Sequence, residues 1–130
     1  MRVTISCPEF NAYEGEAAFV ALPSTDGEIG ILPGHANEIC TVEAGIVRVA
    51  DRAMGTVDHR FAVEGGYAEI TADKVVVLAQ RAADVDAVDP EELRAQLAEF
   101  EEQLSNLSED DAHRAYLYNE VAWCKLLLAA

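Results

Sequence analysis

The sequence predicts a β-sandwich or barrel followed by an antiparallel pair of helices, and three observations indicate this fold. Up to about Ala83, apolar residues occur in short runs that alternate with polar ones, as in strands with one buried face. Turn residues separate these runs at close spacing, which is typical of all-β domains. After Val88, apolar residues recur every three or four positions, and that period indicates helices.

Alternation and glycines mark the strands of the first part. Val3, Ile5 and Cys7 alternate with polar residues, so we expect a strand there. Other apolar runs of strand length follow, at residues 17–22, 46–49 and 75–78. The chain is also apolar on both sides of Gly65 and Gly66. Because glycine readily adopts positive φ, we expect a hairpin at this pair.

Capping residues mark two helix starts. Asp89 can cap the first helix, and Pro90 suits its first turn. Its apolar stripe has spacings of 4, 3, 4 and 3 and consists of Leu93, Leu97, Phe100, Leu104 and Leu107. Ser108 is followed by three acidic residues and repeats the start signal, so we expect a second helix at about residues 109–128. A short connection between two such helices gives an antiparallel hairpin.

Composition bounds both the organisation and the partners. The chain has 130 residues with 24 acidic and 9 basic side chains, a formal net charge of −15. This charge argues against nucleic acid and against anionic lipid, because phosphates would be repelled. No apolar run approaches the roughly 18 residues of a membrane span, so we expect no direct membrane insertion. We expect a β-sandwich domain at residues 1–85 and a helical hairpin at residues 86–130.

No pattern for catalysis or metal binding is recognisable. The histidines and cysteines stand singly, without the close spacing of metal ligands: His35, His59, His113, Cys7, Cys40 and Cys124. We therefore expect no catalytic residue, no metal, no cofactor, and reduced, buried thiols. The glycine-rich segment at residues 26–36 is interpreted as a tight turn or a docking loop. The enzymatic alternative is a small enzyme that uses His35 with Glu28 from that segment.

Four segments have a recognisable sequence and order. They are residues 27–36 (GEIGILPGHA), 45–49 (GIVRV), 61–70 (FAVEGGYAEI) and 75–79 (VVVLA). On these motifs the chain resembles the epsilon subunit of the rotary ATP synthase. The spacing between the motifs and the helical tail also fit, so the resemblance extends over essentially the whole chain.

The resemblance implies an N-terminal β-sandwich of about ten strands and two antiparallel C-terminal helices. It implies a non-catalytic subunit of the central stalk, whose sandwich binds the gamma subunit and the ring of c subunits during proton-driven ATP synthesis. The helices would fold down on the sandwich or extend along gamma to the alpha and beta subunits and restrain ATP hydrolysis. It further implies a peripheral position in the complex, at the cytoplasmic face of the cell membrane.

The resemblance assigns roles to few residues. The family's ring contact falls on the segment that holds Glu28, Ile31 and His35, so these are the candidate c-ring contacts. Members that bind ATP have an aliphatic-Asp-x-x-Arg-Ala motif at the start of the first helix. In this sequence Arg94 matches the motif, whereas Glu91 stands where the Asp is expected. Glu91 and Arg94 are the candidate nucleotide-binding residues.

The charge of the helical tail affects both ATP binding and the restraint of ATP hydrolysis. Residues 86–130 have eleven acidic and three basic side chains, a net charge of −8. Family members use basic side chains along the helices to meet ATP phosphates and an acidic segment of beta, and this tail would be repelled by both. We therefore predict weak or no ATP binding and weak inhibition. A stand-alone nucleotide-sensing module is the remaining alternative.

Overall fold

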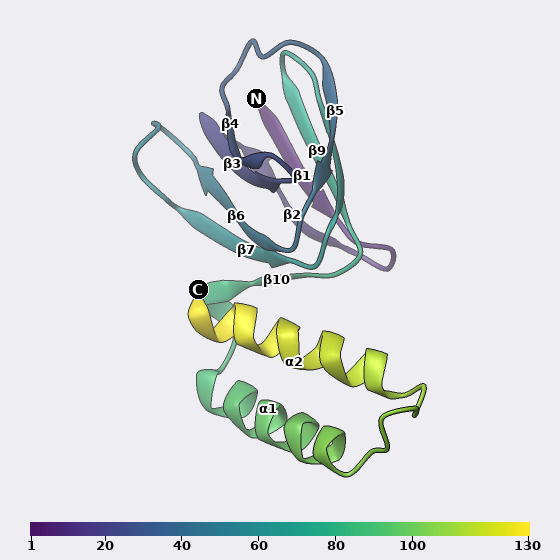
Figure 1. The fold of residues 1–130 in the computed structure, drawn as a ribbon. Helices are drawn as coiled ribbons and strands as arrows, with labels where there is room; N and C mark the ends of the chain where they lie inside the picture. Colours follow the sequence, from purple (N-terminus) through teal and green to yellow (C-terminus); the bar gives the residue numbers. More distant parts are fainter. The chain divides into compact units, whose positions relative to one another are not determined.

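The computed structural model describes all residues from Met1 to Ala130 (Figure 1). The strands are β1 (Arg2–Ser6), β2 (Asn11–Glu16), β3 (Phe19–Ser24), β4 (Gly27–Ile31), β5 (Glu38–Val42), β6 (Gly45–Ala50), β7 (His59–Val63), β8 (Gly66–Ile70), β9 (Lys74–Ala79) and β10 (Ala82–Asp84). They are followed by the short helix η1 (Val85–Ala87), α1 (Pro90–Ser105) and α2 (Arg114–Ala129). The predicted fold class, a β-sandwich of ten strands followed by two helices, is confirmed.

The strands form one sheet that folds into two layers. One layer has the order β10-β7-β6-β3-β4, and the other has the order β5-β8-β9-β1-β2. A single residue pair, Ser24 with Val42, joins β3 to β5 and connects the layers. Only β1 and β9 run parallel; all other neighbours are antiparallel. Because β2 lies beside β10, the sandwich is nearly closed.

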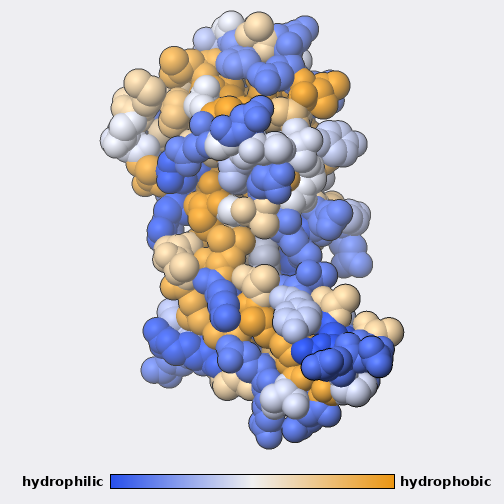
Figure 2. Space-filling model, viewed as in Figure 1, coloured by the Kyte–Doolittle hydropathy of each residue, from blue (hydrophilic) through white to orange (hydrophobic).

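The core lies between the two layers and is aliphatic. Strand β1 is an example: Val3 and Ile5 are fully buried, and the residues that alternate with them, Arg2, Thr4 and Ser6, face outward. The side chains that are buried most completely are Ile5, Leu22, Ile31, Ile70, Val3, Val20, Val47, Val49, Val63 and Val75. Burying each such side chain stabilises the fold by about 1.5–3 kcal/mol. Hydrophobic side chains also reach the surface between hydrophilic ones (Figure 2).

Gly65 and Gly66 do not form the expected hairpin, so that prediction was wrong. Strand β7, before the pair, lies between β6 and β10, whereas β8, after it, lies between β5 and β9. The chain therefore passes from one layer to the other at these glycines. Their φ angles are 132° and 151°, and a Cβ on Gly66 would lie 1.9 Å from the carbonyl oxygen of Leu78. Close approach of two backbones, rather than a tight turn, requires glycine here.

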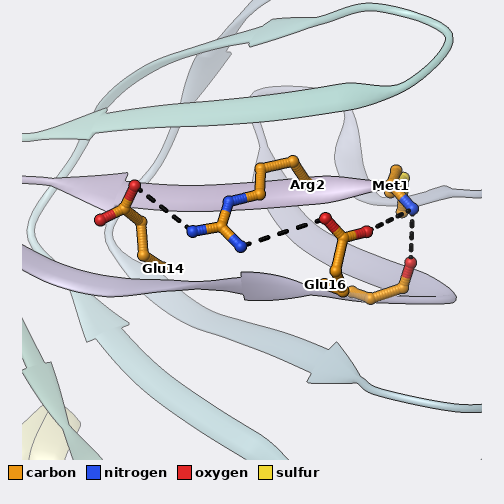
Figure 3. A network of polar contacts seen from close by, with 5 residues as sticks. Met1, Arg2, Glu14 and Glu16 are labelled. Atoms are coloured by element: carbon orange, nitrogen blue, oxygen red, sulfur yellow. Dashed lines mark hydrogen bonds and ion pairs between the residues drawn. The ribbon is translucent and has the colours of Figure 1, made fainter.

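The outer face of β1 and β2 carries a row of charges (Figure 3). Arg2 lies opposite Glu16, and its guanidinium is 3.6 Å from the Glu14 carboxylate and 4.0 Å from that of Glu16. The amino group of Met1 is 3.6 Å from Glu16 and donates a hydrogen bond of 3.0 Å to the carbonyl oxygen of Ala17. Since the side chains of Arg2, Glu14 and Glu16 are about half exposed or more, each ion pair between them contributes at most about 1 kcal/mol.

Helix α1 begins where the sequence predicts. The side chain of Asp89 accepts a hydrogen bond of 3.0 Å from the amide of Glu91, and Pro90 is the first helical residue. The predicted apolar stripe is the less exposed face of the helix, with Leu93 buried. It packs against α2, whose Leu117 is fully buried. The two helices therefore form the expected hairpin.

Helix α2 begins later than expected, at Arg114, and Ser108 does not cap it. The carbonyl oxygen of Ser108 accepts a hydrogen bond of 3.2 Å from the amide of Asp111. The Asp111 side chain in turn accepts one of 2.9 Å from the amide of His113. Local side-chain bonds of this kind compete with the helix, so the acidic run forms turns instead of a first helical turn.

The chain divides into two compact units, Met1–Asp86 and Ala87–Ala130. The first contains all ten strands, and the second contains α1 and α2. Neither helix combines the length and the apolar character that a membrane-spanning helix requires.

Candidate functional site

Glu28 lies on β4, at the edge of its layer, where only β3 pairs with it. Its carboxylate forms an ion pair with the guanidinium of Arg48 on β6. Strand β3 runs between β4 and β6, so the pair spans β3 on the outer face of the sheet. Both side chains are roughly half exposed, at 48% for Glu28 and 40% for Arg48. The pair is therefore open to a partner and adds little to stability.

The segment after β4 is a loop with a defined shape. Gly34 has a φ of 88°, and its amide donates a hydrogen bond of 2.7 Å to the carbonyl oxygen of Ala72. In the ring of His35, Nδ1 lies 2.6 Å from the carbonyl oxygen of Ala36, and Nε2 lies 3.7 Å from the carboxylate of Glu38. Local contacts thus hold His35 at the end of the sandwich where β4 finishes.

Ile31 differs from the other two candidate ring contacts. It is the last residue of β4, lies opposite Val20, and is fully buried in the core. Its side chain cannot form an exposed contact, and the expectation for it has to be corrected. The sequence misses this because the glycine-rich segment hides a strand in its first half. Leu32, the next residue, has 49% of its surface exposed and is an apolar side chain that this loop offers.

Glu28 and His35 have different partners. Glu28 is paired with Arg48, whereas His35 has Glu38 beside it. Glu28 and His35 are therefore not paired with each other, as the enzymatic alternative that uses both would require. No group of histidine, cysteine and acidic side chains in the chain is arranged to hold a metal ion.

A second surface, which the sequence did not reveal, lies on the outer face of the other layer. Ile39 on β5 has 74% of its surface exposed and Tyr67 on β8 has 52%. Tyr67 lies opposite Thr41 and Leu78, so the outward positions of β5, β8 and β9 are adjacent. A hollow of about 480 Å³ adjoins them, lined by Ser6, Cys7, Pro8, Gly66, Tyr67, Leu78, Ala79 and Gln80. Apolar residues on both faces of residues 38–42 are the signal that could have predicted this surface.

The cysteines are free of disulfides and poorly reactive. Cys124 is buried, and Cys7 and Cys40 are half-buried. Burial raises the pKa of the Cys7 and Cys40 thiols above their ordinary value, so little thiolate forms near neutral pH. The expected full burial of all three thiols holds for Cys124 alone.

In the helical unit the candidate nucleotide-binding residues lie on the first two turns of α1. Glu91 and Arg94 are exposed and three positions apart, so they are neighbours on the helix surface. Arg114, another of the three basic residues of the tail, is already engaged. It donates hydrogen bonds to the carbonyl oxygens of Leu104 and Leu107 and to the hydroxyl of Tyr118. Few cations therefore remain for phosphates.

Comparison with known proteins decides the family. The family model for the β-sandwich domain of the ATP synthase delta/epsilon chain matches residues 1–85. The ATP synthase epsilon chain of Rhodospirillum centenum is 42% identical over 103 residues, which cover 79% of this chain and 68% of that protein. This chain belongs to the ATP synthase epsilon chain family. As an epsilon chain it is a non-catalytic subunit of ATP synthase, which confirms that prediction.

Other relatives of this epsilon chain agree. The epsilon chain of Synechococcus elongatus is 38% identical over 112 residues, 85% of this chain and 79% of that protein. Among solved structures, a chain of the Euglena gracilis mitochondrial ATP synthase, described as OSCP/F1/c-ring, has a TM-score of 0.75 at 22% identity, covering 98% of this chain and 78% of that one. A chain of the Tetrahymena thermophila central stalk and c ring has a TM-score of 0.60 at 15% identity, covering 99% and 94%. These two likenesses concern the fold.

Proposed function

We propose that this epsilon chain joins the gamma subunit to the c ring in the central stalk of a proton-driven ATP synthase. The observation that carries the proposal is that the sandwich has two unlike exposed surfaces. One is the apolar sheet face around Ile39 and Tyr67, and the other is the polar end around Glu28 and His35. The Euglena and Tetrahymena neighbours come from assemblies that include the c ring, and this setting supports the proposal.

The gamma subunit is assigned to the outer face of the layer of β5, β8 and β9, here called the β5–β8–β9 face and defined by Ile39, Tyr67, Val76 and Leu78. The exposed Glu69 lies between Ile39 and Val76 on this face. Exposed side chains such as Ile39 are a common mark of a protein interface when they are adjacent on one face. A β-sheet face offers a flat, rigid surface of this kind. The neighbouring hollow of about 480 Å³ would receive a side chain of gamma.

The c ring is assigned to the end of the sandwich that holds Glu28, Leu32 and His35. Glu28 and His35 are polar groups that can change partners, since their present contacts are exposed and weak. Leu32 supplies an apolar side chain beside them. The complex lies at the membrane, and we place this chain as a peripheral component at its cytoplasmic face.

The helical unit is the regulatory part of the proposal. The tail restrains ATP hydrolysis weakly, because its net charge of −8 opposes docking on an acidic surface. Binding of ATP by Glu91 and Arg94 is weak or absent, since Arg114 is committed to the hairpin itself.

Two sets of variants test the two contacts separately. The full chain is tagged and isolated from membranes together with its ATP synthase partners, and gamma and c subunits are quantified. Ile39→Asp should remove gamma, with Tyr116→Asp as control, because Tyr116 is also an exposed large apolar side chain but lies on α2. The double variant Glu28→Ala/His35→Ala should leave gamma bound and lower the amount of c ring that copurifies. Its free energy of unfolding should change by less than about 1 kcal/mol.

The control for the ring contact is Glu43→Ala. Glu43 accepts a hydrogen bond from Thr25 in the turn before β4, at the opposite end of that strand from the loop of His35. Loss of stability with normal assembly in the Glu28 and His35 variants would favour a purely structural turn and contradict the assignment.

A further inference from the structure

The loop between β6 and β7, residues 51–58, covers a hollow that none of the functions above uses. The hollow has a volume of about 290 Å³. Its lining is mostly apolar and consists of Phe19, Arg48, Ala50, Met54, Gly55, Thr56 and Val57. At its rim, Met54 has 64% of its surface exposed and Val57 has 51%. Two adjacent apolar side chains exposed around a concave surface are a feature of interfaces.

The geometry of the loop is fixed by hydrogen bonds at its base. The amide of Asp51 donates to the carboxylate of Asp58 at 2.7 Å, and the amide of Asp58 donates to the carbonyl oxygen of Val49 at 3.0 Å. Nε2 of His59 lies 3.0 Å from the carboxylate of Asp51. The loop therefore presents Met54 and Val57 in a defined position, which lowers the entropy cost of binding.

Strand pairing places the start of this loop close to the start of the loop of His35. Strand β6 ends at Ala50, which lies opposite Phe19 at the start of β3. Strand β4 ends at Ile31, which lies opposite Val20, the next residue of β3. The two loops thus start on either side of the same end of β3.

Arg48 connects the hollow to the candidate ring contact. Its side chain lines the hollow and forms the ion pair with Glu28. Phe19, on the other side of the hollow, covers Gly30 of β4, where a Cβ would lie 2.8 Å from the Phe19 ring. The hollow and Glu28 therefore belong to one continuous surface.

We propose that the hollow is a second contact with the c ring and receives an apolar side chain from the ring surface that faces the sandwich. The inference rests on the proposed function, because the occupant is chosen by continuity with Glu28. An apolar occupant is chosen because Phe19, Met54 and Val57 dominate the lining. The ring is favoured over gamma because the hollow belongs to the layer of β3 and β6, whereas the face assigned to gamma is on the layer of β5, β8 and β9.

Photo-crosslinking in the assembled enzyme tests this contact. A photoreactive amino acid, p-benzoylphenylalanine, replaces Met54 or Val57 in the full chain, and membranes with the assembled ATP synthase are irradiated. The expected product joins this chain to a c subunit. A product with gamma, a product between two copies of this chain, or no product would overturn the inference.

The same substitution at His35 distinguishes failure of this second contact from failure of the ring contact at Glu28 and His35. Ring products at position 35 but not at 54 or 57 would refute the second contact alone. Absence of ring products at all three positions would refute the ring contact of the proposed function as well. Binding is measured as the number of c subunits that copurify with each copy of this chain. Met54→Glu should lower this number by roughly tenfold, and the matched variant Met54→Leu should leave it unchanged.

Discussion

Arg114, the first residue of α2, donates a hydrogen bond of 3.3 Å to the carbonyl oxygen of Leu104, near the end of α1. A second bond of 3.3 Å goes to the carbonyl oxygen of Leu107, and a third of 2.8 Å goes to the hydroxyl of Tyr118. A cation beside the last carbonyls of a helix also interacts favourably with the helix dipole. One side chain therefore closes the turn of the hairpin and anchors both helices.

Removal of Arg114 should loosen the hairpin turn. Arg114→Ala leaves the carbonyls of Leu104 and Leu107 without this donor, at an expected cost of about 1 kcal/mol. Hydrogen exchange of the Asn106 and Leu107 amides should then become roughly fivefold faster. Arg94→Ala, a change of the same kind on the exposed surface of α1, is the control and should leave these rates unchanged. Equal rates in the two variants would show that the helix packing alone holds the turn.

A side chain at Gly66 should be poorly tolerated. Gly66 has a φ of 151°, and a Cβ there would meet the Leu78 carbonyl oxygen at 1.9 Å. We expect Gly66→Ala to lower the free energy of unfolding by about 3 kcal/mol or more, from backbone strain and forced separation of β8 from β9. Gly34→Ala is the matched control, because Gly34 also has a positive φ, of 88°, but has open space around it. Denaturant unfolding of both variants compares them, and equal losses would contradict the close approach.

Tyr13 should make the sandwich sensitive to alkaline pH. Burial, together with the charge of Asp51 and a hydrogen bond to it, raises the pKa of Tyr13 above its ordinary value of 10.0. The unfolded chain then loses this proton at lower pH than the folded one. The contribution of Tyr13 to the free energy of unfolding is fully present below about pH 10 and is lost as the pH rises toward the pKa of the folded state. The free energy of unfolding should then fall by up to about 1.4 kcal/mol per pH unit.

Unfolding measured from pH 8 to 11 checks the role of Tyr13. Tyr13→Phe should make the free energy of unfolding depend less on pH in this range, whereas Tyr67→Phe, at an exposed tyrosine, should not. Parallel profiles for the Tyr13 variant and the unchanged chain would mean that other groups cause the alkaline loss.

ATP should bind the isolated chain weakly or not at all. Of the three basic residues of the tail, Arg114 is held by the hairpin, and the same segment, residues 86–130, contains eleven acidic residues. Isothermal titration of the full chain with ATP should give no heat of binding at micromolar concentrations. Deleting residues 88–130 in the assembled enzyme should change its ATP hydrolysis rate by less than about twofold. Micromolar affinity, or a many-fold activation, would show that the acidic tail does not prevent regulation.

Local patterns predict most of the fold, and non-local contacts account for the errors. The alternation of Val3 and Ile5 and the cap at Asp89 depend on near neighbours, so the sequence predicts these elements correctly. Gly66 must be glycine because the backbone of Leu78, in the next strand, leaves no room for a Cβ. The local sequence around Gly66 cannot distinguish a connection between the two layers from a hairpin. The start of α2 depends on the hydrogen bond from the His113 amide to the Asp111 side chain. This bond competes with a first helical turn at residues 109–113, and the local sequence is compatible with either structure.

The candidate site was predictable only in part. Glu28 is an exposed polar residue and His35 a partly exposed one, and their positions follow from a motif. Ile31 was misplaced because three glycines conceal that it ends a strand. The exposure of Ile39 and Met54 depends on which face of a strand or loop the rest of the chain leaves uncovered. That information arises only when the two layers have been assembled.

The sandwich should fold and bind without the tail. All ten strands lie within Met1–Asp86, and Asp86 pairs with Arg60 at 2.7 Å, so the cut belongs after residue 87. The fragment of residues 1–87 should unfold cooperatively, as followed by circular dichroism during heating. A fragment that stays unfolded would mean that the helices supply part of its core.

Copurification of gamma with the tagged full chain tests whether this epsilon chain binds gamma in the central stalk. The chain and gamma are produced together and isolated through a tag on the chain. We expect a stable complex in a 1:1 ratio that survives gel filtration and is lost in Ile39→Asp. A chain that elutes as a free monomer, with gamma absent at every concentration examined, would contradict the assignment to the central stalk.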